Sequence, residues 1–97
     1  MPEKTFTIPL SAECFRTGPR VLDFVVRLMI YRRDGEVEVV ARYDTAHGIA
    51  HLDQLKQGGR LLQKTWLPHL DFNEAYEYAL EEFKTNHGHY LQRWRDA

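Results

Sequence analysis

Cysteine is nearly absent from the 97-residue sequence, and so are long apolar runs. The single cysteine, Cys14, excludes an internal disulfide bond and any zinc cluster built from cysteines. The most apolar run, Val21 to Tyr31, is too short to span a bilayer and is interrupted by Asp23 and Arg27. The first residues lack the apolar core of a signal peptide. These absences predict a soluble, cytoplasmic protein with no membrane contact.

A surplus of positive charge is also lacking. The chain carries 13 Lys and Arg residues against 14 Asp and Glu residues, a formal net charge of −1 at pH 7. This balance argues against a protein that binds nucleic acid over its whole surface, and it leaves room for a local basic patch. The length and the 43% of hydrophobic residues suffice for one core, so residues 1–97 are predicted to form a single domain.

The first third of the chain contains one strong strand pattern. Residues 5–10 alternate only briefly, and Pro9 limits them to an edge strand or a strand end. Residues 11–20 contain Gly18-Pro19, which predicts a break before the next element. Residues 21–31 then alternate with a period of two, as expected of a strand with one face on the core. The residues predicted to face the core are Leu22, Phe24, Val26, Leu28 and Ile30.

Three further strands are predicted from turn signals. Asp34-Gly35 between two β-rich runs predicts a hairpin, with residues 36–43 as the returning strand. Residues 49–56 and 60–66 predict two more strands around a turn at Gln57-Gly58-Gly59. Because every connection is short, these strands are predicted to form a meander of successive hairpins.

The C-terminal third predicts a helix. Asp71 and Glu74 match an Asp-x-x-Glu version of the capping box, which marks a helix start. Asn86-His87-Gly88 interrupts the helical pattern, which indicates an end or a kink. The residues at helical spacing that are predicted to pack on the sheet are Phe72, Ala75, Ala79, Phe83, Tyr90 and Trp94. The predicted fold class is therefore α+β: a mainly antiparallel sheet of four to five strands with a C-terminal helix on one face.

Residues 42–53 concentrate the side chains that could carry chemistry. In an extended chain, His47, His51 and Asp53 would share one face. Two imidazoles suit an acid/base pair, because histidine titrates near neutral pH. The same three side chains suit a metal ion, although the chain has no established metal motif. Arg42 can clamp a phosphate through its planar fork, while ordinary ion pairs and turn contacts of Arg42 and Asp44 remain a purely structural explanation.

A basic rim is predicted around the second turn. Lys56, Arg60 and Lys64 add positive charge there, and Tyr43 and Trp66 are expected nearby. This combination suits single-stranded RNA, whose bases stack on aromatic rings. A solvated charged turn is the alternative explanation for the same residues.

The central motif carries a resemblance. The run Arg42-Tyr43-Asp44-Thr45-Ala46-His47-Gly48-x-x-His51-x-Asp53 resembles a group of small, uncharacterised prokaryotic proteins with an RYD-x-AHG-x-x-H-x-D signature, over residues 37–83. Its central dozen residues are distantly similar to TumE-like toxins of toxin–antitoxin systems. That similarity implies a protein that attacks RNA and is held in check by a DNA-binding antitoxin encoded beside it. The positions on the shared pattern are Arg42, Asp44, His47 and His51; Leu52-Asp53 stands where the toxins have a denser histidine run.

The leading hypothesis is a toxin-like, metal-independent ribonuclease that needs no cofactor. His47 and His51 would serve as acid and base. Arg42 would bind the phosphate, and Asp44 would orient a histidine. The substrate-binding residues would be Tyr43, Lys56, Arg60 and Lys64.

Two other hypotheses come from different classes of protein. One is a non-catalytic interaction module, a homodimer or a partner-binding chain that uses the sheet edge or the aromatic tail at residues 90–94. The other is a metal-dependent hydrolase in which His47, His51 and Asp53 share an ion. Both catalytic hypotheses require the polar side chains of residues 42–53 to meet in one place.

Overall fold

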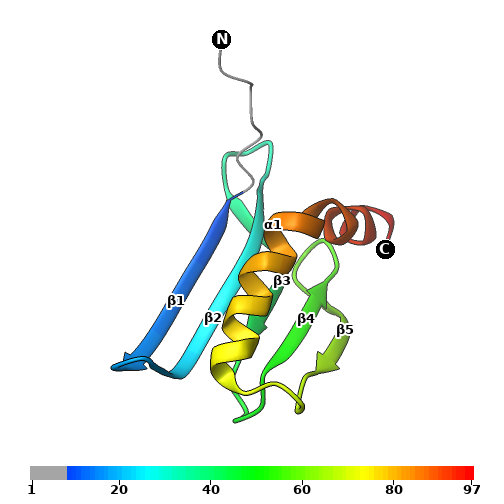
Figure 1. The fold of residues 1–97 in the computed structure, drawn as a ribbon. Helices are drawn as coiled ribbons and strands as arrows, with labels where there is room; N and C mark the ends of the chain where they lie inside the picture. The colour runs from blue at the N-terminus through cyan, green and yellow to red at the C-terminus, as the bar shows by residue number, and fades with distance from the viewer. Residues whose placement is uncertain (1–8) are drawn as a thin grey trace.

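The structure, a computed structural model, describes residues 9–97; the part of the predicted 5–10 strand before Pro9 lies outside the described residues. The strands form one antiparallel sheet in the order β1-β2-β3-β4-β5, and the helix lies across one of its faces (Figure 1). The predicted α+β meander is thus confirmed. The elements are β1 (Leu10–Thr17), β2 (Arg20–Tyr31), β3 (Val37–Asp44), β4 (His51–Leu55), β5 (Leu61–Trp66) and α1 (Phe72–Asp96).

The hairpin predicted at Asp34-Gly35 joins β2 to β3. Gly35 has a φ of 86°, a left-handed value that glycine adopts without steric cost. The backbone N–H of Arg32 donates to the carbonyl of Glu36 at 2.8 Å and closes the turn. The turn at residues 57–59 joins β4 to β5 in the same way, with the Lys56 N–H donating to the Arg60 carbonyl at 2.7 Å.

Strand β1 corrects the prediction for the N-terminal region. The sequence predicted strand character only for residues 5–10, whereas residues 11–17 also form a strand that pairs with β2, and the break predicted at Gly18-Pro19 is the turn between them. The pattern was hard to detect because most of the β1 side chains are exposed on both faces. Backbone hydrogen bonds to β2 hold this edge strand in place, so its side chains need not alternate between apolar and polar.

The sheet has three register irregularities, in the β1–β2, β2–β3 and β4–β5 pairs, and the first changes which residues of β2 face the core. The β1–β2 register passes from Phe15↔Asp23 to Arg16↔Val21, which leaves Leu22 as an extra residue. A bulge reverses the alternation beyond it. Val21 is therefore buried and Leu22 is 44% exposed, so the prediction that Leu22 faces the core was wrong. A similar shift leaves Val40 as the extra residue of β3.

Helix α1 begins where the capping box predicts. The Asp71 side chain accepts from the Glu74 N–H at 2.8 Å, and the Glu74 carboxylate accepts from the Asp71 N–H at 3.1 Å. Asn86 has non-helical angles, φ −118° and ψ 21°, so the predicted interruption is a kink. Beyond the kink, Tyr90 and Trp94 are buried in the core, which means that the aromatic tail covers the sheet.

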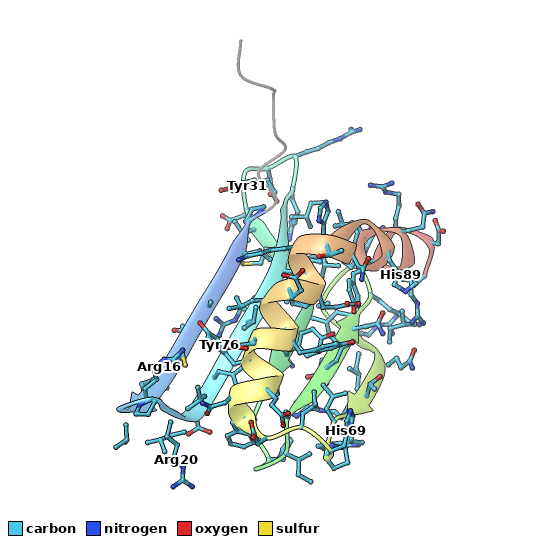
Figure 2. The ribbon with its side chains drawn as sticks, in the orientation of Figure 1. Arg16, Arg20, Tyr31, His69, Tyr76 and His89 are labelled. Carbon is cyan, nitrogen blue, oxygen red and sulfur yellow. The ribbon has the colours of Figure 1, made fainter. Side chains whose placement is uncertain are left out.

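The helix packs over β2, β3 and β4 and leaves the opposite face of the sheet without a covering element in residues 9–97 (Figure 1). At the margin of the helix-covered side, the Arg16 guanidinium of β1 lies 5.6 Å from the centre of the Tyr76 ring of α1 (Figure 2). Among the described residues, no helix combines the length and the apolar character needed to cross a membrane.

Candidate functional site

The polar residues of the central motif meet on the sheet face opposite α1, which we call the open face. Asp44 pairs with His51, and Arg42 pairs with Asp53, so alternation points all four side chains to the same side. Lys64 and Trp66 of β5 pair with Asp53 and His51 and extend the same two rows across the sheet. The strand register alone therefore brings together side chains as far apart in the sequence as Arg42 and Trp66, which are 24 positions apart.

The loop of residues 45–50, between β3 and β4, is held in place by its own hydrogen bonds. The Thr45 hydroxyl accepts from the Phe24 N–H at 3.1 Å and donates to an Asp23 carboxylate oxygen at 2.9 Å. The Gly48 N–H donates to the Thr45 carbonyl at 2.9 Å, and Gly48 has a φ of 79°, which requires glycine. His47 lies at the exposed tip of this loop.

His51 is covered by two rings rather than by a helix. Its side chain is 1% exposed, with the Trp66 ring centre 5.1 Å and the His47 ring centre 5.7 Å from its own. Its Nδ1 lies 3.1 Å from the Ile49 carbonyl oxygen, and its Nε2 lies 2.9 Å from Asp44 Oδ1. The ring orientation is therefore fixed at both nitrogens.

The two carboxylates beside His51 are also buried; both lie near Arg42, and Asp53 also pairs with Lys64. Asp53 is 2% exposed, and its Oδ2 lies 3.2 Å from Arg42 Nε while its Oδ1 lies 3.0 Å from Lys64 Nζ. Asp44 Oδ2 lies 3.6 Å from the same Arg42 Nε, and Asp44 Oδ1 accepts from the Ala46 N–H at 3.0 Å. Removing two carboxylates from water costs free energy that these cations offset.

A hollow in the open face adjoins this cluster. It has a volume of about 370 Å³ and is lined by parts of β1, β2 and the 45–50 loop, including Phe15, Asp23 and Asp44. Asp44 thus lies between the buried cluster and the hollow, so a molecule bound in the hollow can contact the Asp44 side chain. The hollow is partly apolar because Phe15 and Val25 form one side of it.

Most of the predicted site residues lie on the open face. Arg42, Asp44 and His51 converge there, with His47 above them and Lys64 beside them. The ligating atoms that lie together are those of Asp44, His51 and Asp53. The metal set predicted from sequence contained His47 in place of Asp44, because it took residues 47–53 as one continuous strand, whereas β4 begins at His51.

Tyr43 does not belong to the site, which corrects its predicted role in substrate binding. As the neighbour of Arg42 and Asp44 in a strand, it points to the opposite face and is 2% exposed under α1. Its hydroxyl lies 3.2 Å from that of Tyr90, which donates to Glu82 Oε1 at 2.8 Å. Burial, and then the hydrogen bond with Tyr90, raises the pKa of Tyr43 above its usual range.

Lys56 and Arg60 do not lie with the central cluster either. They flank the turn at the far end of the β4–β5 hairpin, whereas His51 and Trp66 are at its near end. Four strand steps separate His51 from Leu55, a distance of about 13 Å.

Trp66 was not among the predicted site residues. The spacing of Lys64 and Trp66, two apart on a strand, is the signal that places both on one face.

A small antiparallel sheet with one helix-covered face and one polar face defines the chain as a compact α+β domain with a histidine–carboxylate cluster. The model of the family described as a domain of unknown function, DUF7718, matches residues 1–97, and the chain belongs to that family. No curated protein and no solved structure matches the chain.

Proposed function

We propose that this DUF7718 chain binds single-stranded RNA on the open face of its sheet and cuts it, as the toxin of a toxin–antitoxin pair in the cytoplasm. The observation that carries the proposal is the exposed pair of His47 and Trp66, with ring centres 6.1 Å apart, beside the cationic side chain of Lys64. Trp66 is 47% exposed, and Lys64 Nζ lies 5.2 Å from its ring centre. An aromatic ring next to a cation suits a stacked base and its phosphate.

Each exposed group has a role in this proposal. A base stacks on Trp66, while Lys64 and Arg42 contact the phosphate beside it. His47 takes the proton from the ribose 2′-hydroxyl, whose oxygen attacks the adjacent phosphorus, and the leaving 5′-oxygen takes up a proton from solvent. The resemblance of the Arg-Tyr-Asp and histidine motif to TumE-like toxins supports the same reaction class.

His51 has a different role from the one first expected for it. Because its ring is 1% exposed, a substrate cannot touch it while Trp66 and His47 cover it. In the proposal, His51 is a positioning residue that supports the His47 ring from below. The direct acid/base partnership of the two histidines would require the 45–50 loop to open.

The test measures cleavage of a labelled single-stranded RNA by the purified chain. His47→Ala is expected to lose about 100-fold or more of the rate, the contribution typical of one positioned proton-transfer group. His89→Ala is the matched control, since His89 is an exposed histidine beyond the helix kink (Figure 2). Equal cleavage by His47→Ala and wild type, with both folded, would reject the catalytic assignment.

Binding is tested separately from cleavage. Trp66→Ala is expected to weaken RNA binding about 5- to 100-fold, because stacking on one aromatic ring contributes about 1–3 kcal/mol per base. The antitoxin part of the proposal predicts that a neighbouring DNA-binding protein copurifies with the chain and suppresses its activity. A chain that binds no RNA at low salt leaves the interaction module as the better description.

A specific observation favours that second candidate. Phe15 of β1 is 68% exposed and Leu22 of β2 is 44% exposed, near the outer edge of the sheet. Exposed apolar side chains on a strand edge are typical of an interface with another chain. The interaction module predicts a dimer or a stable complex that survives loss of His47 and is weakened by Phe15→Ser. Light scattering after size-exclusion chromatography measures the oligomeric state.

A further inference from the structure

The cluster of Asp44, His51 and Asp53 deserves a separate explanation from the RNA proposal, because none of its three members is exposed. One ligand atom from each residue lies within 4.8 Å of the others. Asp44 and His51 face each other across β3 and β4, and Asp53 is the next residue of β4 on the same face. The protein therefore holds an imidazole and two carboxylates together, largely out of solvent.

Both ring nitrogens of His51 face oxygen acceptors, so its tautomer determines which contact is a hydrogen bond. A carbonyl oxygen only accepts, so Nδ1 donates to the Ile49 carbonyl at 3.1 Å in the tautomer that carries its proton on Nδ1, whereas the other tautomer donates from Nε2 to Asp44 Oδ1 at 2.9 Å. In the first tautomer of the neutral ring, Nε2 has a lone pair. That lone pair faces Asp44 Oδ1 at 2.9 Å and Asp53 Oδ2 at 3.7 Å, which are also acceptors. Asp44 Oδ1 also accepts from the Ala46 N–H and Asp53 Oδ2 from Arg42 Nε, so in this tautomer the Nε2 lone pair is the group that a bound cation would satisfy.

Asp53 gives a second, independent observation. It is 2% exposed, and among the described residues its Oδ1 has no partner in hydrogen-bond geometry. Lys64 Nζ lies 3.0 Å from this oxygen but is not aligned to donate to it. The ion pair with Lys64 offsets the charge of Asp53, while a hydrogen-bonding position of this buried oxygen stays open, and a bound ion is one explanation for such a position in a native site.

We propose that Asp44, His51 and Asp53 bind a divalent transition-metal cation, Mn²⁺ or Zn²⁺. Imidazole and carboxylate together suit these ions, and the bond lengths of about 2.0–2.2 Å put neighbouring ligand atoms about 3–4 Å apart. The distances of 2.9 Å and 3.7 Å from His51 Nε2 already lie near this range. A metal-bound histidine typically donates its other N–H to a backbone carbonyl, and His51 Nδ1 lies 3.1 Å from the Ile49 carbonyl oxygen, in place for such a bond.

The cation would compete with the two basic side chains for the same carboxylates. The Arg42 and Lys64 side chains are 41% and 26% exposed, so both can turn outward when the metal neutralises Asp53. Metal binding would thereby release two cationic side chains onto the open face. His47 is not a ligand in this arrangement, so the metal site and the proposed proton transfer by His47 are separate claims.

The test titrates Mn²⁺ into the purified, chelator-treated chain and measures free Mn²⁺ by electron paramagnetic resonance, without RNA. Wild type is expected to bind one Mn²⁺ per chain, and Asp53→Asn is expected to bind at least tenfold more weakly. Glu13→Gln is the matched control, because Glu13 is an open-face carboxylate paired with an arginine, Arg27, outside the cluster. Its binding is expected to equal that of wild type.

Lys64→Met sharpens the test, because it removes a competitor for Asp53 without removing a ligand. This variant is expected to bind Mn²⁺ more tightly than wild type, a gain that loss of folding cannot produce. If neither wild type nor Lys64→Met binds Mn²⁺ with a stoichiometry of one, or if Asp53→Asn binds as well as wild type, the proposal is overturned. Loss of RNA cleavage alone bears only on the His47 proposal.

Discussion

The two faces of the sheet bury side chains by different means. On the helix-covered face, α1 lays Ala75, Ala79 and Phe83 over the apolar residues of β2, β3 and β4. On the open face, Asp44, His51 and Asp53 are buried, and they are covered only by neighbouring side chains such as Trp66. Burial on the first face removes apolar area from water and stabilises the fold. Burial on the second face costs desolvation that ion pairs only offset, so stability does not explain it.

This difference in how the two faces bury their side chains indicates that the function resides on the open face. A protein that needed only a stable sheet would leave the open face of β3 and β4 exposed and polar. Here the face opposite the helix holds Asp53 at 2% and His51 at 1% exposure. Residues that are held against their solvation preference next to specific charged partners are candidates for chemistry or ion binding.

The largest expected loss of stability comes from a substitution on the helix-covered face. Phe83→Ala removes a ring that is 1% exposed and lies 4.9 Å from the Tyr43 ring. The free energy of unfolding is expected to fall by about 3–5 kcal/mol, from lost burial and the cavity that remains. Urea denaturation measures it. Phe15→Ala is the control on the other face: Phe15 is 68% exposed, and a change above about 0.5 kcal/mol there would contradict the comparison.

A smaller effect is expected on the open face. Lys64→Met leaves Asp53 buried with Arg42 as its remaining cation, and the free energy of unfolding is expected to fall by about 1–3 kcal/mol. The double variant Asp53→Leu/Lys64→Met is expected to be more stable than the single variant, because it removes the buried charge as well. Thermal unfolding of the four chains of this cycle gives the coupling energy. Additive effects would contradict the pairing of the two side chains.

The smallest effect concerns the hydroxyl of Tyr43. Burial raises the pKa of Tyr43 and of Tyr90, so the folded chain keeps both protons when the unfolded chain loses them, near the ordinary value of 10.0. Stability from these groups is therefore fully present below about pH 10 and is lost as the pH rises above it. Tyr43→Phe is expected to cost about 0.5–1.5 kcal/mol at neutral pH and to show a shallower alkaline loss.

The measurement is the unfolding midpoint in urea from pH 7 to pH 11. Tyr31→Phe is the control, since the Tyr31 side chain is 65% exposed at the end of β2 (Figure 2). Parallel alkaline profiles for wild type and Tyr43→Phe would show that the buried hydroxyl does not set this dependence.

Most of the architecture could be predicted from local signals. Asp34-Gly35 and Gly58-Gly59 fix hairpins because their backbone angles suit glycine, and the Asp71 capping box fixes the helix start. The kink at Asn86 was predicted from the polar and glycine interruption that follows it. Each of these depends on a few adjacent residues, which a sequence displays directly.

What depends on pairing between distant strands could not be predicted. The extra residues Leu22 and Val40 arise from the register with neighbouring strands, and they reverse the faces beyond them. Strand β1 has no strong alternation of its own, because β2 supplies its partner groups. In the site, the burial of Asp53 depends on Lys64 from the next strand, so its environment was not visible in residues 42–53 alone.

The 45–50 loop has a consequence for how this family can vary in length. The pairs Asp44↔His51 and Arg42↔Asp53 flank it, and a one-residue slip in β4 would turn His51 and Asp53 toward the helix. An insertion at the exposed tip around His47 leaves those pairs in place. Relatives are therefore expected to gain or lose residues at the tip and to keep the flanking strands free of insertions and deletions.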